Sequence, residues 1–307
     1  MKYLIGLDCG ATKTACALAD ENGEILQTLT GKPANLLING TDNTSKNICS
    51  LIKECKAQYD FKFDEVKSLV IGAAGAGRKE DAESLKNSLI DLFNAEGINI
   101  KKLTVVSDVQ IALKGAFPDS SGAILIAGTG SIICGKDEQG NFYRVGGFGR
   151  LIGDEGSGYS IGRKALISAA KYLDGRNNKI FLVDLILNKL KIKSSDDLIN
   201  KIYKENFDIA SAAKDVIIAA EKGDETALSI LNEESDEMLL KIKTIAKKMN
   251  AGNMKLSFTG GLISNENIYT EMIKKKIHSS LPNVKIVTPL KMPVEGAILY
   301  AKEMLNE

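Results

Sequence analysis

The chain has 307 residues and a formal net charge of +1, with 44% hydrophobic and 26% charged residues. At roughly 150 residues per domain, this length predicts about two domains, each able to form a core without disulfides or metals. The balanced charge argues against a dedicated nucleic-acid-binding protein, because such proteins usually carry a marked excess of lysine and arginine. No apolar run approaches the ~18 residues of a membrane span, and residues 3–7 are shorter than the roughly 7–15 apolar residues of a signal peptide. We therefore expect a cytoplasmic protein without membrane or nucleic-acid partners.

The cysteine and histidine content excludes several catalytic classes. The only histidine, His278, follows a run of lysines, so zinc catalysis with several histidine ligands is excluded and a Ser-His-Asp enzyme is disfavoured. No pair of cysteines forms a C-x-x-C motif, and we expect reduced, mostly buried thiols. Carboxylate, lysine or tyrosine side chains remain for acid–base chemistry. The five cysteines are Cys9, Cys16, Cys49, Cys55 and Cys134.

The first part of the chain predicts a strand pair followed by alternating helices and strands. Apolar runs bounded by small or acidic residues predict the strands, and one-sided apolar spacing predicts the helices. Thr41 is the expected N-terminal cap of the first helix. In chain order we expect a strand at 3–7, a turn at 8–14, strands at 15–19 and 25–29 around an acidic turn at 20–23, a helix at 41–58, a strand at 66–71, a helix at 82–93 and a strand at 103–106.

The second part of the chain begins with the same order of elements. A strand, a small hydroxyl-bearing turn, a second strand, an acidic turn and a third strand recur, which indicates an internal duplication. Alternation of strands and helices predicts an α/β fold with mostly parallel central pairings, and two leading hairpins predict two mixed sheets that face a cleft. The expected elements are strands at 123–127, 132–134 and 256–258, turns at 128–131 and 137–140, and helices at 161–173, 180–190, 212–221, 227–249 and 294–305.

Glycine-rich turns after predicted strands point to an anion-binding site. Such turns bring backbone N–H groups close to a phosphate, although a tight turn alone also needs glycine. The chain has no G-x-x-x-x-G-K-[ST] motif, and Ile133 stands where a dinucleotide fingerprint needs a third glycine. Asp8 instead lies beside hydroxyl side chains, a combination that can hold Mg²⁺ and phosphate oxygens. The turns are 6–10, 72–77, 128–130, 146–158 and 260–261.

The segment 146–158 contains six glycines in thirteen residues, which excludes a helix or a regular strand. Its adjacent acids, Asp154 and Glu155, could approach a polyhydroxylated ligand. A mobile linker is the alternative. We disfavour the linker because Phe148, Leu151 and Ile152 are expected to give the segment apolar side chains to bury.

Taken together in this order, the motifs resemble those of the BadF/BadG/BcrA/BcrD-type ATPase family in the actin/hexokinase/Hsp70 superfamily. Within that family the chain looks most similar to the N-acetylglucosamine kinases. The resemblance covers residues 3 to 261, and one departure is Phe148, where some relatives carry Trp. The motifs that carry it are Asp8-Cys9-Gly10-Ala11-Thr12-Lys13-Thr14, Ala127-Gly128-Thr129-Gly130-Ser131, Gly147-Phe148-Gly149, Gly153-Asp154-Glu155-Gly156-Ser157 and Thr259-Gly260-Gly261.

The resemblance implies an α/β fold of two ribonuclease H-like, actin-like ATPase domains with a cleft between them. The expected domains are 1–115 plus 290–307, and 116–289. The resemblance also implies that Asp108 is the catalytic base and that Asp8 positions the metal. The ATP-binding residues it implies are Asp8, Gly10, Thr12, Lys13, Thr14, Thr129, Ala210, Gly260 and Gly261. The sugar-binding residues it implies are Asn35, Gly130, Ser131, Gly147, Phe148, Gly149 and Asp154.

The activity implied is an ATP- and Mg²⁺-dependent amino-sugar kinase that phosphorylates the 6-hydroxyl of N-acetylglucosamine, with N-acetylmuramate as a further candidate, in a homodimer. A glucosamine kinase is one alternative. Another is an ATPase activator of an acyl-CoA dehydratase or reductase, which would need cysteine ligands for an iron–sulfur cluster in its second domain. Cys134 is the only cysteine after Cys55, which speaks against the activator. A nucleotide-dependent binding module is a third class, disfavoured by the Asp108 carboxylate.

Overall fold

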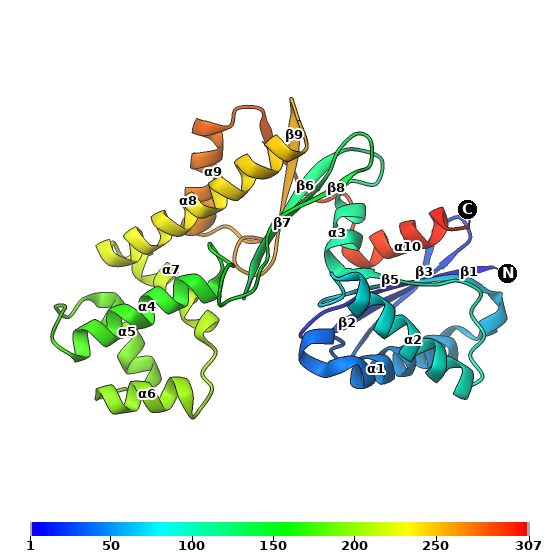
Figure 1. Ribbon diagram of the computed structural model, residues 1–307, viewed down its shortest axis with the longest axis horizontal. Helices are drawn as coiled ribbons and strands as arrows, with labels where there is room; N and C mark the ends of the chain where they lie inside the picture. The colour runs from blue at the N-terminus through cyan, green and yellow to red at the C-terminus, as the bar shows by residue number, and fades with distance from the viewer. Residues whose placement is uncertain (1, 306–307) are drawn as a thin grey trace. The chain divides into compact units, whose positions relative to one another are not determined.

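The computed structural model describes residues 2–305, which divide into two compact units. One unit comprises the chain up to Ser120 together with the residues from Thr288 onward, and the other is Ser121–Val287. Each unit contains one five-stranded mixed sheet with helices packed against it (Figure 1). The first unit is therefore discontinuous in sequence, whereas the second is continuous.

The sheet of the first unit has the order β3-β2-β1-β4-β5. The first three strands are antiparallel neighbours, and β4 and β5 continue the sheet parallel to β1. Its carboxyl edge therefore gathers the ends of β1, β4 and β5 beside the turn that joins β1 to β2. The strands are β1 (Tyr3–Cys9), β2 (Thr14–Asp20), β3 (Ile25–Gly31), β4 (Val66–Ala73) and β5 (Leu103–Ser107).

Strand alternation divides the first unit into two hydrophobic layers. On β1, Ile5 and Leu7 pack in the cluster that includes residues of α1 and α2, whereas Leu4 packs in the cluster that includes residues of α3 and α10. A Cβ on Gly6 would come within 2.9 Å of Ala297 and Ile298, so glycine lets α10 lie directly on the strand. The helices are α1 (Leu36–Tyr59), α2 (Lys79–Ala95), α3 (Asp108–Ala116) and α10 (Pro293–Glu303), with a short 3₁₀ turn, η1 (Phe63–Glu65).

The second unit repeats the sheet of the first. Its order, β10-β9-β6-β7-β8, has the same sequence of antiparallel and parallel neighbours. The acidic turns also match, because Asp20 and Asp137 each accept backbone N–H bonds from the residues two and four positions later. The predicted internal duplication is confirmed. The strands are β6 (Gly122–Ala127), β7 (Ser131–Lys136), β8 (Phe142–Gly146), β9 (Met254–Thr259) and β10 (Val284–Ile286).

The helices of the second unit share one large core with one face of its sheet. Ala123, Leu125 and Ala127 point from β6 into this core, which includes residues from all the α-helices of the unit. The long helix α8 contacts β7, β8 and α4, a placement that matters for the site described below (Figure 1). The helices are α4 (Gly158–Leu173), α5 (Phe181–Leu190), α6 (Ser195–Tyr203), η2 (Ile209–Ala212), α7 (Ala213–Glu221), α8 (Glu225–Lys248) and α9 (Ile268–Ser280).

Two expectations from the sequence were wrong. The first helix begins at Leu36 with Asn35 as its cap, rather than at Thr41, and it is interrupted at Gly40, where φ is +71°. The apolar side chains of the glycine-rich segment are not buried, since Phe148, Leu151 and Ile152 are 70%, 87% and 81% exposed. The segment is held by other contacts, which are described with the site.

The five cysteines are buried free thiols, as predicted, and His278 is exposed in the last turn of α9. Cys134 lies within β7, in the interior of the second unit. Over residues 2–305, every helix is too short or too polar to cross a lipid bilayer.

Candidate active site

The carboxyl edge of the first sheet carries the two acids predicted from the sequence. Asp8 lies near the end of β1, paired with Gly72 of β4, which in turn pairs with Val106 of β5. Asp108 follows β5 and is the first residue of α3, where Ser107 and Gln110 form a reciprocal capping box. In open α/β sheets, ligands bind beyond the carboxyl ends of the parallel strands, which is where both carboxylates lie.

The two carboxylates are close enough to affect each other electrostatically. Burial, with a further contribution from the charge of Asp108, raises the pKa of Asp8 to about 6, although Lys13 opposes the shift. Burial also raises the pKa of Asp108, while N–H groups of Val109 and of its own backbone work in the opposite direction. Two partly buried acids that disfavour each other's charge are a suitable pair for a divalent cation or for proton transfer.

The turn after β1 presents Thr12 and Lys13 to solvent. Gly10 closes the turn by donating its N–H to the carbonyl of Lys13 at 3.1 Å. Thr14 is buried, and its hydroxyl donates to the carbonyl of Lys32 at 2.7 Å, so this side chain supports the turn from within. The exposed hydroxyl of Thr12 is therefore the one free to meet a ligand that approaches the turn.

Asn35 stands beside this turn, because the N–H of Ala34 bonds to the carbonyl of Gly10. Its Oδ1 accepts hydrogen bonds from the N–H groups of Leu37 and Ile38 and thereby caps α1. The cap fixes the orientation of the side chain and assigns its oxygen to the helix. The amide NH₂ of Asn35 is the part that remains to donate to a ligand.

The second unit has an equivalent turn between β6 and β7. Gly128 donates its N–H to the carbonyl of Gly130 at 2.9 Å, and Thr129 is exposed at the tip. Ser131 is the first residue of β7, as Thr14 is the first residue of β2, and it is also buried. Its hydroxyl donates to the carbonyl of Glu155 at 2.5 Å. The two turns thus share one design, with an exposed threonine at the tip and a buried hydroxyl at its base.

Asp154 is pressed against the turn between β6 and β7. Its backbone is left-handed, with φ of +60°, and only 8% of the residue is exposed. A Cβ on Gly130 would lie 2.8 Å from Oδ2 of Asp154, so the carboxylate needs a glycine at this position. Asp154, which is predicted to bind the sugar, therefore lies next to the turn at Thr129, which is predicted to bind phosphate.

The segment Gly147-Phe148-Gly149 follows β8 on the same edge of the sheet. Both glycines have positive φ angles, +70° and +88°, which fit them for this sharp path. The guanidinium of Arg144 donates to the carbonyls of Gly146 and Gly147 and lies over the ring of Phe148, 5.6 Å from its centroid. Arg144, which the sequence alone did not single out, thus supports the backbone of this segment.

The residues predicted to border the nucleoside lie at the same edge of the second unit. Gly260 follows β9 with φ of +100°, and a Cβ there would come 2.4 Å from the carbonyl of Ala127. A Cβ on Gly158, at the start of α4, would lie 3.3 Å from the carbonyl of Ala210. Glycines therefore allow the backbones of β6, β9, α4 and η2 to approach closely around the turn at Thr129.

The predicted site residues thus form two groups, each at the carboxyl edge of one sheet. The first unit brings together Asp8, Gly10, Thr12, Lys13, Thr14, Asn35 and Asp108. The second unit brings together Thr129, Gly130, Ser131, Gly147, Phe148, Gly149, Asp154, Ala210, Gly260 and Gly261.

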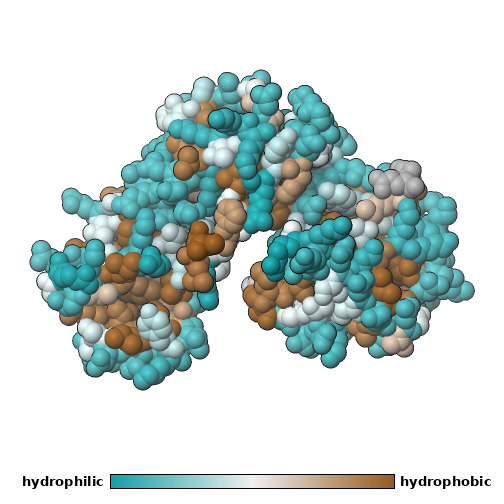
Figure 2. Space-filling model, viewed as in Figure 1, coloured by the Kyte–Doolittle hydropathy of each residue, from teal (hydrophilic) through white to brown (hydrophobic). Residues whose placement is uncertain are grey.

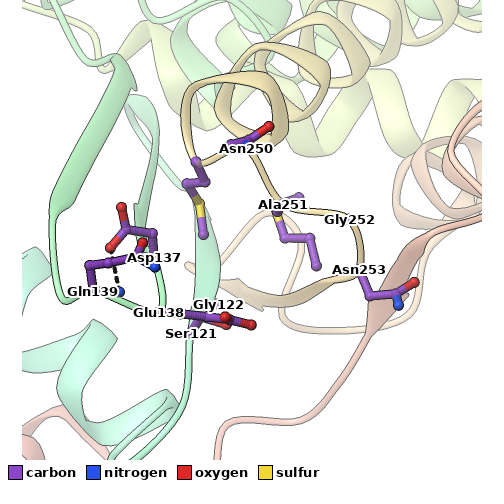
Figure 3. A pocket seen from close by; sticks show the side chains of 11 residues that line it. Ser121, Gly122, Asp137, Glu138, Gln139, Asn250, Ala251, Gly252 and Asn253 are labelled. Carbon is purple, nitrogen blue, oxygen red and sulfur yellow. Dashed lines mark hydrogen bonds between the residues drawn. The ribbon is translucent and has the colours of Figure 1, made fainter.

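The second unit also has two hollows, one away from these residues and one beside them, since Ile209 and Tyr159 of the second hollow adjoin Ala210 and Gly158. A polar hollow of about 440 Å³ is lined by Ser121, Asp137 and the segment 249–254 (Figure 3). It lies at the opposite end of β6 and β7 from the turn at Thr129, roughly 20 Å away at about 3.3 Å per residue. A groove of about 430 Å³ between α4 and α6 is mainly apolar, in a region where hydrophobic surface is visible (Figure 2).

Comparison with known proteins identifies the family. The model of the BadF/BadG/BcrA/BcrD ATPase family matches residues 5–301. An N-acetylmuramic acid/N-acetylglucosamine kinase of Clostridium acetobutylicum is 36% identical over 98% of this chain and 99% of its own length. An N-acetyl-D-glucosamine kinase of Dictyostelium discoideum is 30% identical, with 98% of both chains covered.

A solved structure of a candidate N-acetylglucosamine kinase from Chromobacterium violaceum has a TM-score of 0.79, at 21% identity, over 97% of this chain and 98% of its own. At this identity the likeness concerns the fold alone, and with the duplicated sheets it confirms two ribonuclease H-like domains. The family model and the full-length relatives together assign the sequence to one family. The chain belongs to the BadF/BadG/BcrA/BcrD ATPase family.

Proposed function

We propose that the chain is an ATP-dependent amino-sugar kinase that transfers the γ-phosphoryl group to the 6-hydroxyl of N-acetylglucosamine, with N-acetylmuramate as a second acceptor. The observation that carries the proposal is the carboxylate pair, Asp8 and Asp108, at the edge that also presents the exposed hydroxyl of Thr12. The names and full-length similarity of the two relatives support the choice of acceptor.

Asp108 is the proposed catalytic base. It stands at the first turn of α3, and its Oδ1 is oriented by the N–H of Val109 at 2.9 Å, which leaves Oδ2 for the acceptor hydroxyl. Phosphoryl transfer needs little covalent chemistry from the protein, so the main contribution of Asp108 is to orient the hydroxyl and to accept its proton.

ATP is proposed to bind through the two matching turns. The hydroxyls of Thr12 and Thr129 and the N–H of Lys13 would donate to phosphate oxygens, while Gly10 closes the first turn through its bond to the Lys13 carbonyl. Ala210, Gly260 and Gly261 would border the nucleoside, where the absence of bulky side chains lets backbone approach the ligand. Thr14 would contribute indirectly, because its buried hydroxyl supports the first turn through the hydrogen bond to the carbonyl of Lys32.

The residues at the first edge fit a magnesium ion. Mg²⁺ is usually held by one or two carboxylates, with water and substrate phosphates completing its shell, and Asp8 supplies such a carboxylate. When bound, the ion would neutralise charge on the β- and γ-phosphates. Asp8 would be its carboxylate partner.

The sugar is proposed to contact Asn35 of the first unit and, in the second unit, Asp154, the segment 147–149, Gly130 and Ser131. Asp154 is held in a left-handed conformation by its surroundings and can accept hydrogen bonds from sugar hydroxyls. Asn35 can donate from its amide, because its oxygen is occupied by the cap of α1. We also expect a homodimer, which light scattering coupled to size-exclusion chromatography would measure.

The alternative of an activator with a shared iron–sulfur cluster is disfavoured by the placement of the thiols. A cluster between subunits needs cysteines at the surface, whereas Cys134 is 1% exposed within β7. A glucosamine kinase differs from the proposed enzyme only in the acceptor.

The decisive experiment is a coupled assay with ATP, Mg²⁺ and a panel of N-acetylglucosamine, N-acetylmuramate, glucosamine and glucose. We expect the highest kcat/KM with the N-acetylated sugars and a 6-phosphate product by NMR. A preference for glucosamine would show that glucosamine, and not N-acetylglucosamine, is the acceptor. Failure to phosphorylate any of these sugars would overturn the proposed kinase.

A further inference from the structure

Helix α8 carries three buried side chains that face the acidic segment of the second unit. Glu234 and Met238 are one turn apart, and Lys241 follows after a second turn, so all three lie on one face of the helix. Glu234 is 1% and Lys241 is 5% exposed, although residues of these types are rarely buried without partners. Their partners lie in the two segments assigned above to phosphate and sugar.

Lys241 connects the turn between β6 and β7 to the acidic segment. Its ammonium donates to Oγ of Ser131 and to the carbonyl of Glu155, each at 2.7 Å, and lies 3.4 Å from the Glu155 carboxylate. The same ammonium lies against Gly146, where an added Cβ would be 3.2 Å from Nζ. One side chain thus contacts the start of β7, the end of β8 and the residue after Asp154.

Glu234 and Tyr269 hold the next residue of the segment, Gly156. The N–H of Gly156 donates to Oε2 of Glu234, and its carbonyl accepts from the hydroxyl of the buried Tyr269 at 2.9 Å. Oε1 of Glu234 accepts from the Ser160 hydroxyl at 2.7 Å and pairs with Lys164 at 2.8 Å. The backbone on the carboxyl side of Asp154 is therefore fixed at two consecutive residues, although the apolar side chains of the segment are exposed.

Resting on the proposed kinase function, we propose that Lys241 and Glu234 are positioning residues for phosphoryl transfer. They set the distance between Asp154 and the turn at Thr129, and so the placement of the acceptor relative to the γ-phosphate. Neither side chain touches the substrates. Displacement of a reacting group by about 1 Å can cost ~10²-fold in rate. We therefore expect substitution of Lys241 or Glu234 to lower kcat.

The test compares Lys241→Met, which keeps the stem and removes the donors, with Lys189→Met as control. Lys189 also pairs with a buried acid of the second unit, Asp215 at 2.9 Å, but in the α5–α7 region. We expect Lys241→Met to lower kcat roughly 10–100-fold and to raise the sugar KM, with affinity for ADP within about threefold. Lys189→Met should lower the melting temperature and leave both kinetic constants within about twofold.

Hydrogen exchange separates this inference from the proposed function. Lys241→Met should speed amide exchange in residues 154–160 even if no amino sugar is a substrate, whereas Lys189→Met should not. An inactive wild-type protein with this exchange pattern would contradict the kinase and, with it, the role in phosphoryl transfer, and would retain only the finding that Lys241 fixes the backbone at 154–160. Unchanged exchange in 154–160, or an active enzyme whose kcat and sugar KM stay within twofold in Lys241→Met, would overturn the positioning role.

Glu234 supplies a second pair of variants in case Lys241→Met does not fold. Glu234→Gln keeps an acceptor for the Gly156 N–H, and it should retain kcat within about fivefold. Glu234→Leu removes the acceptor and should reproduce the loss of turnover seen with Lys241→Met. Equal kcat in the two Glu234 variants would contradict the positioning role.

Discussion

Replacing Asp8 with asparagine should stabilise the protein at neutral pH while removing its proposed kinase activity. Asp8 is an acid whose ionised form is disfavoured in the folded protein, because burial and the neighbouring charge of Asp108 raise its pKa to about 6. Asparagine has nearly the same shape and carries no charge. The substitution therefore removes an unfavourable charge from the folded state along with the carboxylate assigned to the metal.

The magnitude follows from the shift between the ordinary pKa of 3.8 and the value of about 6 in the folded protein. Each unit of pKa corresponds to about 1.4 kcal/mol, so the full shift amounts to about 3 kcal/mol of unfolding free energy. Because Asp8 keeps some contact with solvent, we expect roughly 1–3 kcal/mol. The contribution of Asp8 to stability is fully present below pH 4 and is lost as the pH rises through 6, since the folded state binds this proton more tightly than the unfolded state does.

The assay is urea unfolding of wild type and Asp8→Asn at pH 4 and pH 7, without nucleotide or divalent cation. The two proteins should differ little at pH 4, and the variant should be more stable at pH 7. Asp137→Asn is the matched control, for which the expected change in unfolding free energy has the opposite sign. Burial works against ionisation of Asp137, but hydrogen bonds from Asn141, Tyr143 and two backbone N–H groups outweigh it and hold its pKa below the ordinary value.

In the control, the stabilisation by the Asp137 carboxylate is present above pH 4 and lost as the pH falls through its lowered pKa. Asp137→Asn should therefore be less stable than wild type at pH 7. If Asp8→Asn were no more stable than wild type at pH 7, or gained equally at pH 4, the electrostatic account of Asp8 would be refuted.

Three further substitutions test other parts of the structure. Asp108→Asn should lower kcat about 10²–10⁴-fold and change sugar affinity far less, and near-normal turnover would remove Asp108 from its role as base. Cys134→Ser should leave kcat within a few-fold, because the thiol is interior to β7; recovery of an oxygen-sensitive iron protein would instead favour the activator. Gly296→Ala should cost about 1–3 kcal/mol or more in a melting experiment, since its Cβ would lie 2.0 Å from the carbonyl of Ile111. Gly252→Ala, which would meet nothing within 4 Å, is the control, and equal melting temperatures would contradict the packing argument.

Most of the strands and their turns could be predicted from the sequence because their signals are local. The first strand and its turn, for example, need only an apolar run that ends in Asp8 and Gly10. Helix α3 was missed, although Ser107 and Gln110 have the spacing of a capping box, which could have located its start at Asp108. The three-residue strand β10 and the short helix α6 were missed as well.

The support of the site could not be predicted, because it depends on tertiary packing. Lys241 lies in a lysine-rich helix and looks solvated in the sequence, and only its spacing from Glu234 hints at a shared face. Conversely, Phe148 is apolar and suggested burial, but the fold leaves its ring exposed beside Arg144. Whether a side chain meets a partner is decided by segments far away in sequence.

The discontinuous first unit has a consequence for synthesis of the protein. Helix α10 packs with Ile111 of α3 over Leu4 and Val70 of the sheet, yet it is translated only after the whole second unit. At about 5–20 residues per second, a ribosome needs roughly 10–30 s to make residues 121–287, during which α3 covers this face of the sheet without α10. The continuous second unit can fold on the ribosome, whereas the first must wait for α10. A premature stop before Pro293 would therefore leave a finished second unit attached to a first unit that lacks one side of its core.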